Sequence, residues 1–326
     1  MALVIGPGGG GGTTQTLTTQ PLSNFDVSGT PVRLAVDAQG KLYISDPLRH
    51  AVLVYSNNGL FLSTIQGIEK PLGIAVDGSG TLYVGDAETG SVLIYDGSGH
   101  YVTRLGSGEG EFVYPNDIAI SSSGNIFVAD SAAHVVKAYS SAGSFSFGDT
   151  VLLYPTGIVV DDIAGEVYVS DDPSKSIIVF DLNGLYRRTI RLGSSFSPTV
   201  LRPQGLSVDA QNIYIADAYN SAIAAYTKSG TFIKFIGNYG SNLGEMRVPL
   251  DAALDRDGKL FVANYNNERI EEIGIGTTFT DISVSPAMVQ FTVHECTALP
   301  SQTVNVSSGA SAVAWTAYAT VPWITL

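Results

Sequence analysis

The chain has 326 residues, of which 44% are hydrophobic and only 14% are charged, and it contains 36 glycines. This composition favours many short strands joined by tight turns over long solvated helices. The formal net charge of −13 disfavours binding to the phosphate backbone of nucleic acids.

Residues 1–12 combine the apolar stretch Ala2–Ile5 with a run of glycines that begins at Gly6. They resemble the end of a bacterial lipoprotein signal, but Pro7 stands where the lipid-bearing cysteine would be and no charged segment precedes it. An arbitrary start followed by a glycine linker is the alternative. We expect a flexible leader here and a secreted, cell-surface or periplasmic location. No run of 18 apolar residues occurs, so no transmembrane span is predicted.

One motif recurs six times after residue 30. Each copy has a proline, an apolar strand, a turn and a second apolar strand, and both strands end in Asp except at Ser121 and Asn264. The prolines are Pro31, Pro71, Pro115, Pro155, Pro203 and Pro249, which lie 40, 44, 40, 48 and 46 residues apart. This period predicts an all-β, six-bladed propeller over residues 13–278.

Four strands can be recognised within a unit, at residues 73–77, 82–85, 91–95 and 101–105 of the second copy. The sixth copy ends after its third strand, near Ile273. Residues 13–22 precede the first copy and have the composition of a strand. We therefore predict that they supply the outer strand of the sixth blade and close the ring.

The motif P-x-G-I-A-V-D-x-x-G-x-L-Y-V-x-D, seen best at Pro71–Asp86, resembles the NHL repeat over about four-fifths of the chain. The resemblance implies a six-bladed NHL-type propeller and a role in protein–protein interaction. NHL repeats usually continue N-x-R-[IV], and only Asn267–Ile270, with Arg269, keeps that pattern. The other copies have a different residue at the arginine position, namely Ala51, Ser91, Val135, Ser176 and Ala222.

Aspartates that recur in nearly every unit lack the asymmetry that an active site needs. Asp also accepts hydrogen bonds readily from turn amides. We therefore expect structural roles for Asp37, Asp46, Asp77, Asp86, Asp130, Asp161, Asp171, Asp209, Asp217 and Asp255.

The third residue of the motif differs between copies and is expected at the mouth of the channel. These residues are Arg33, Gly73, Asp117, Gly157, Gly205 and Asp251. Three glycines would leave the mouth open, and the two aspartates fall on opposite blades. Arg33, Asp117 and Asp251 are therefore candidate binding residues.

The tripeptide Pro-Asn-Asp that ends in Asn116 and Asp117 resembles the calcium-binding motif of lactonase-type six-bladed enzymes. Asn116, Asp117 and Asp251 are therefore the candidate metal ligands. Calcium prefers six to eight oxygen ligands, and no clear further carboxylate partners accompany this step. We predict no cofactor, with calcium as the alternative.

No catalytic residue is predicted. The four histidines, His50, His100, His134 and His294, fall in unrelated segments and are not expected to converge. No Ser-His-Asp arrangement, P-loop or dinucleotide motif occurs.

Residues 279–326 break the repeat and contain the only cysteine, Cys296. Strands are expected at 281–286, 289–293, 302–307, 314–317 and 322–326. The opening V-S-P-x-x-x-x-F and the two tryptophan strands resemble part of a bacterial Ig-like sandwich of the BACON type, which implies binding to glycans or mucins. The segment is shorter than a complete sandwich of roughly 100 residues. Either the sequence is truncated or another chain completes the sandwich by self-association.

We expect a non-catalytic, secreted or surface-displayed scaffold for protein–protein interaction or extracellular assembly. The NHL resemblance implies partners such as a multihaem cytochrome system or a fibre. The alternatives are a calcium-dependent lactonase or lyase and a structural subunit of an extracellular fibre joined through the incomplete sandwich.

Overall fold

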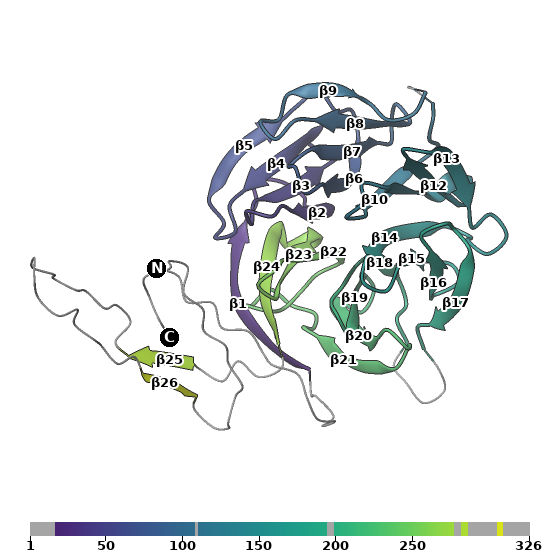
Figure 1. Cartoon of the computed structure of the whole chain (residues 1–326). Coiled ribbons are helices and arrows are strands. Elements are labelled where there is room, and N and C mark those ends of the chain that lie inside the picture. The colour runs from purple at the N-terminus through teal and green to yellow at the C-terminus, as the bar shows by residue number, and fades with distance from the viewer. Residues whose placement is uncertain (1–16, 108–109, 194–198, 277–281, 286–304, 309–326) are drawn as a thin grey trace, which may run out of the picture. The chain divides into compact units, whose positions relative to one another are not determined.

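A computed structural model of the chain describes residues 17–107, 110–193, 199–276, 282–285 and 305–308. Six four-stranded antiparallel sheets surround a central channel, as Figure 1 shows. The predicted all-β, six-bladed propeller is confirmed. Among the described residues, no helix has the length and apolar character needed to cross a membrane.

Five blades are built from four consecutive strands that run from the channel outwards. The first two blades consist of β2 (Arg33–Val36), β3 (Leu42–Asp46), β4 (Ala51–Tyr55) and β5 (Phe61–Ile65), and of β6 (Pro71–Val76), β7 (Leu82–Asp86), β8 (Ser91–Tyr95) and β9 (Tyr101–Arg104). The third consists of β10 (Pro115–Ile120), β11 (Ile126–Asp130), the 3-10 turn η1 (Ser131–Ala133), β12 (Val135–Ser140) and β13 (Gly143–Phe147). The fourth and fifth consist of β14 (Pro155–Asp161), β15 (Glu166–Asp171), β16 (Ser176–Asp181) and β17 (Tyr186–Arg191), and of β18 (Pro203–Val208), β19 (Asn212–Asp217), β20 (Ala222–Thr227) and β21 (Phe232–Ile236).

The sixth blade joins the two ends of the propeller. It contains β22 (Pro249–Leu254), β23 (Lys259–Asn264), the 3-10 turn η2 (Tyr265–Asn267) and β24 (Arg269–Gly276), and β1 (Thr18–Asp26) pairs with the outer side of β24. The predicted closing strand is confirmed, and its described part runs from Thr18 to Asp26. Ser23 Oγ donates a hydrogen bond to Glu272 of β24 at 2.7 Å, which adds a side-chain contact to the pairing of the two strands.

Aromatic pairs join the third and fourth strands in four blades. In each pair the rings meet edge to face, with centroids 5.3–6.4 Å apart and planes inclined by 72–80°: Tyr55–Phe61, Tyr95–Tyr101, Phe180–Tyr186 and Tyr226–Phe232. The strand register shifts at the first residue of every pair. Such a bulge increases the local twist of a strand pair and re-aims the side chain at the bulge, which here sets the ring of the outer strand against the ring of the third strand.

The recurring aspartates have the structural role expected of them. Those that end the second strands are 0–2% exposed and accept backbone amide hydrogen bonds from the connection that enters the same blade. In the third blade, for example, Asp130 accepts from the amides of Val113 at 3.0 Å and Tyr114 at 2.7 Å. Those that end the first strands cap the next turn, as Asp255 does for the amides of Asp257 and Lys259.

Two short strands are described in the C-terminal segment. β25 (Ile282–Ser285) pairs antiparallel with β26 (Asn305–Ser308). The strands predicted at 289–293, 314–317 and 322–326 lie outside the described residues, as do residues 1–12 and His294. The partial Ig-like sandwich stays a prediction.

Candidate functional site

The central channel contains a cavity of about 190 Å³ that is lined by the inner strands of all six blades. Asp117 of β10 and Asp251 of β22 both line this cavity. They belong to the third and sixth blades, which lie opposite each other in the ring. The structure therefore brings the two predicted carboxylates to one channel.

Arg33 of β2 closes the end of the channel at which the inner strands begin. The residue is only 2% exposed. Its Nη1 donates to the carbonyl oxygen of Leu250 at 2.8 Å, and its Nε donates to the carbonyl oxygen of Asn116 at 3.2 Å. Its Nη2 donates to Asn116 Oδ1 at 3.0 Å and to the carbonyl oxygen of Thr156. The prediction of an open mouth is wrong, because one guanidinium from the first blade reaches the third, fourth and sixth.

The glycines provide close approach between blades rather than an opening. A Cβ atom at Gly73 would lie 2.7 Å from the Asp117 Cα atom. One at Gly205 would lie 1.7 Å from Asp251 Oδ1 and 2.9 Å from Arg33 Nη1. Side chains at these positions would therefore collide with the residues that fill the channel.

Each of the two aspartates also fastens its blade to the next one. Asp117 Oδ2 accepts a hydrogen bond from the amide of Ile158 in the fourth blade at 2.9 Å. Asp251 Oδ2 accepts from the amide of Leu34 in the first blade at 2.8 Å. The carboxylates are thus part of the contacts that hold neighbouring inner strands together.

Burial raises the pKa of Asp117 to about 7. The positive charge of Arg33 opposes this rise, whereas the negative charge of Asp251 adds to it. Burial also raises the pKa of Asp251, again opposed by Arg33. Two carboxyl groups and one guanidinium share this desolvated space, so one proton bound by the pair balances the charge. The channel therefore holds two carboxyl groups whose pKa values burial raises above their usual range.

The candidate calcium ligands already have other partners. Asn116 Oδ1 accepts from Arg33, and Asn116 Nδ2 donates to Ser131 Oγ at 3.0 Å. Within the described residues, no group of three or more His, Cys, Asp or Glu side chains is arranged to hold a metal ion. Calcium at Asn116, Asp117 and Asp251 would therefore have to displace the Arg33 guanidinium.

The three described histidines are not brought together. The ring of His50 contacts the carbonyl oxygen of Glu69, and the ring of His134 contacts that of Leu153. His100 lies beside Asp96, 3.4 Å away, in a turn of the second blade. Each histidine belongs to a different local contact, as the sequence predicts for these three.

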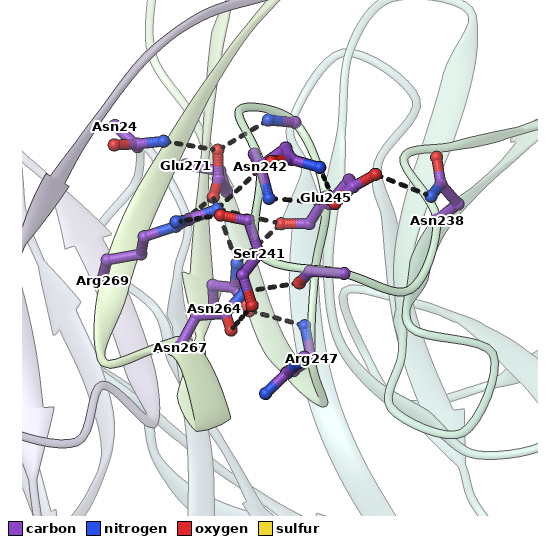
Figure 2. Close-up of polar contacts among 12 residues, drawn as sticks. Asn24, Asn238, Ser241, Asn242, Glu245, Arg247, Asn264, Asn267, Arg269 and Glu271 are labelled. Atoms are coloured by element: carbon purple, nitrogen blue, oxygen red, sulfur yellow. Dashed lines mark hydrogen bonds and ion pairs between the residues drawn. The ribbon is translucent and has the colours of Figure 1, made fainter.

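Arg269, the one arginine that keeps the NHL pattern, holds the connection between the fifth and sixth blades (Figure 2). It pairs with Glu271, and its Nη atoms donate to the carbonyl oxygens of Ser241 at 2.8 Å and Asn242 at 2.7 Å. Its role is therefore to anchor a long loop, and the pattern N-x-R-I was the signal for it.

Glu271 extends this network to the closing strand. Its carboxylate is fully buried and accepts from the Gly244 amide at 3.0 Å, from Asn264 Nδ2 at 3.2 Å and from Asn24 Nδ2 of β1 at 3.5 Å (Figure 2). Asn264 is the residue that replaces Asp in the sixth copy of the motif. Its amide group supplies a donor to Glu271 that a carboxylate would lack.

We use the name mouth face for the end of the ring at which the inner strands begin. Because strands alternate in direction, the connections between blades and the loops between second and third strands all lie there. Among the described residues of these segments, six that are apolar or aromatic are 50–71% exposed: Leu48, Val113, Leu153, Tyr219, Tyr239 and Leu243. The sequence does not predict this set, because the exposure of single loop residues leaves no periodic signal.

The mouth face also carries half-buried residues, among them Lys70, Tyr114 and Tyr154. Lys70 Nζ stands 5.3 Å from the ring centroid of Tyr114. Burial raises the pKa of Tyr154, and Tyr114 and Asp172 contribute further. A basic group and an aromatic ring therefore adjoin each other on the mouth face.

Comparisons with known proteins agree with the fold. A family model described as a 6-bladed beta-propeller matches residues 74–151. Virginiamycin B lyase from Staphylococcus aureus is 11% identical, with a TM-score of 0.58 over 79% of this chain and 99% of that chain. A gluconolactonase from Xanthomonas campestris is 18% identical, with a TM-score of 0.63 over 77% of this chain and 88% of that chain. A chain of the nidogen/laminin complex is 18% identical, with a TM-score of 0.56 over 63% of this chain and 79% of that chain. At these identities the similarity shows the fold alone: this chain is a six-bladed β-propeller.

Proposed function

We propose that this protein is a non-catalytic scaffold, secreted or displayed at the cell surface, that binds another protein through its mouth face. The observation that carries the proposal is the set of six exposed apolar and aromatic residues on that face. Loops held by a rigid framework are common sites of recognition. Aromatic side chains are enriched at the centres of protein interfaces and contribute disproportionately to affinity.

The opposite face has a different character. Its turns expose the aliphatic Leu60, Ile163 and Leu185, and Phe61, Tyr101 and Tyr186, which begin outer strands at the same end, are 49–54% exposed. Exposed carboxylates occur on both faces, as at Asp96 and Asp257 here and at Glu69 and Glu88 on the mouth face, so charge does not distinguish the two. Aromatic residues are enriched in the cores of protein interfaces. Tyr219 and Tyr239 of the mouth face, at 71% and 68%, are more exposed than the aromatic residues of the opposite face, so the mouth face is the better candidate.

The closed channel supports recognition at the surface rather than within the ring. Arg33 is buried and bonded to three other blades at this end. The cavity behind it, about 190 Å³, is smaller than the roughly 300–1,000 Å³ of typical ligand sites. A partner at the mouth face would therefore contact loops and not the channel interior.

Two matched triple variants test the proposal. Leu48→Ser, Leu153→Ser and Tyr219→Ser change the mouth face, whereas Leu60→Ser, Ile163→Ser and Leu185→Ser change the opposite face. Each protein is used to capture partners from the native source, with quantification by mass spectrometry. We expect a specific partner whose recovery falls about tenfold or more with the first triple and is kept with the second. Equal recovery with both triples would contradict the mouth-face assignment.

A calcium-dependent lactonase or lyase is the second candidate, and the Asp117–Asp251 pair at the cavity is the observation in its favour. Metal analysis of the purified protein, together with Asp117→Ala and Asp251→Ala, separates the two functions. One equivalent of calcium that both variants lose would support the enzyme. Metal content that the variants leave unchanged would count against it.

A further inference from the structure

The outer strand of the third blade, β13, differs from the outer strands of the other blades. It follows β12 after a turn of only two residues, since the register closes on the pair Ser140–Gly143. It contains no charged residue and no proline, and its first four residues are exposed. In the described part of the chain, no strand pairs with its outer side (Figure 1). β13 is therefore an exposed sheet edge at the rim of the ring.

The other outer strands carry features that hinder pairing with a further strand. β5, β9, β17 and β21 each contain a bulge, because the register with the third strand of the blade shifts. Three of these four also carry basic residues, namely Arg104 in β9, Arg187, Arg188 and Arg191 in β17, and Lys234 in β21. β1 contains Pro21, which has no amide hydrogen to donate.

Bulges, charges and proline are the features by which natural sheets avoid association through their edges. β13 has none of them, because its register with β12 continues without a shift from Ser140 to Val136. The third blade is thus the one whose outer strand is open to a further strand.

The register of β13 also fixes which backbone groups face outwards. Ser140 and Gly143 close a two-residue hairpin, so this pair exchanges hydrogen bonds. Hydrogen-bonded pairs alternate along an antiparallel ladder, so Phe145 also bonds to β12. The amide and carbonyl groups of Ser144 and Ser146 therefore point away from the blade.

We propose that β13 pairs antiparallel with the β13 of a second copy of this chain, which joins the two third blades into one continuous sheet. The sequence Ser144-Phe145-Ser146 reads the same in both directions. A two-fold axis beside Phe145 sets Ser144 of each chain opposite Ser146 of the other. Both of these pairs exchange backbone hydrogen bonds, because their groups face outwards.

The side chains of β13 suit a symmetric partner. A two-fold axis sets like residues against each other, so a charged side chain at the centre would face its own charge. β13 has Phe145 there, and its side chain is 40% exposed. The ring lies 6.0 Å from that of Phe147, which in turn lies 4.9 Å from Phe180 of the fourth blade. Aromatic residues opposite each other stabilise a strand pair, so a second Phe145 extends this row.

The net charge of −13 opposes self-association, and one strand pair is a small interface. A weak, reversible dimer is therefore the expected form. β13 contains none of the six mouth-face residues, so the proposal is independent of the function proposed above.

Sedimentation equilibrium of the full chain between about 1 and 200 µM tests the proposal. We expect the mass to rise with concentration towards that of two chains. A reductant keeps Cys296 from linking two chains. Phe145→Lys and Phe145→Glu each set like charges opposite one another and should weaken association at least about tenfold. An equal mixture of the two variants should dimerise again, since a lysine then faces a glutamate.

Two further variants separate the backbone contacts from the charge. Ser146→Pro removes an outward amide without adding charge and should weaken association about tenfold as well. Leu62→Lys adds a charge to the bulged outer strand of the first blade, where the side chain is 45% exposed, and should leave association unchanged. Melting temperatures confirm that all variants are folded.

Three results would overturn the proposal. The first is a wild-type chain that stays monomeric up to about 200 µM. The second is association that Phe145→Lys and Ser146→Pro leave unchanged, because another surface would then form the dimer. The third is a mixture of Phe145→Lys and Phe145→Glu that associates no better than either variant alone, which would exclude the symmetric register.

Discussion

Arg33 Nη2 donates a hydrogen bond to the carbonyl oxygen of Thr156, which lies 123 residues later in the chain and on the opposite side of the ring. The same guanidinium reaches Asn116 and Leu250 on two further blades. A single buried side chain therefore connects the first blade with the sixth blade beside it and with the third and fourth blades across the channel.

Replacing Arg33 with Met should destabilise the protein by about 3–5 kcal/mol, because removal of one partner leaves buried charge uncompensated. Asp117 and Asp251 would lose the positive charge that now opposes their protonation. Chemical denaturation measures the free energy of unfolding. Arg256→Met, at an exposed position, serves as the control and should change it by less than about 0.5 kcal/mol. A similar small change for Arg33→Met would show that the channel contacts contribute little.

Stability should fall as the pH rises from about 4 to about 7, owing to Asp117. Its pKa is raised from the usual 3.8 to about 7 in the folded protein. Between these values the unfolded chain loses the proton while the folded protein keeps it, so the contribution is fully present below pH 3.8 and lost above about pH 7. Asp117→Asn removes this dependence. Unfolding free energies measured across the window should therefore diverge between the two proteins, and parallel curves would contradict the assignment.

Restoring the consensus Asp at position 264 should destabilise the sixth blade. Asn264→Asp replaces the donor to Glu271 by a second carboxylate and also removes the hydrogen bond to the Glu245 carbonyl oxygen. We expect a loss of about 1–3 kcal/mol in chemical denaturation. Asn266→Asp adds the same charge at an exposed neighbouring position and is the control. Equal stability of the two variants would mean that the network tolerates the charge.

Arg269→Leu should release the connection between the fifth and sixth blades. The substitution removes the ion pair to Glu271 and the bonds to the carbonyl oxygens of Ser241 and Asn242. We expect faster amide exchange over residues 238–247 and a loss of about 3 kcal/mol. Arg49→Leu removes a more exposed pair with Asp46 and should cost less than about 1 kcal/mol. Unchanged exchange in the loop would argue against an anchoring role.

Deleting β1 should lower the melting temperature sharply and promote aggregation. Without Thr18–Asp26, the outer side of β24 becomes an unpaired edge, and the ring is no longer closed by both ends of the chain. Scanning calorimetry and light scattering test both effects. Deletion of residues 1–12 shortens the chain without removing strand β1 and is the control. A melting temperature unaffected by the loss of β1 would contradict its closing role.

The repeat made the propeller and the role of its aspartates predictable. Each Asp at the end of a strand accepts hydrogen bonds from amides close by in the sequence. The amide lies either in the turn that follows or just before the proline of the same copy, as with Tyr114 and Asp130. Periodicity alone therefore indicates the contact. The closing strand could be placed to within a few residues because the sixth copy visibly lacks one. Its register could not be predicted, since it depends on pairs such as Ser23 with Glu272 that are 249 residues apart.

The channel could be predicted in part. The sequence identified Arg33, Asp117 and Asp251 as the residues that differ between copies, and the structure brings them together. The direction of the Arg33 side chain was not predictable, because its acceptors are backbone carbonyl oxygens, which every residue has.

The reach of Arg33 also limits how this ring can change in size. Its guanidinium contacts the inner strands of the third, fourth and sixth blades at hydrogen-bonding distance. An inserted or deleted blade would alter the width of the channel, and a side chain of fixed length could no longer meet all of these acceptors. A change in the order of the blades would also break these contacts. The position equivalent to Arg33 in the second blade is Gly73, which has no side chain to replace the guanidinium. The blades look interchangeable in sequence, yet this one residue ties the protein to six of them in a single order.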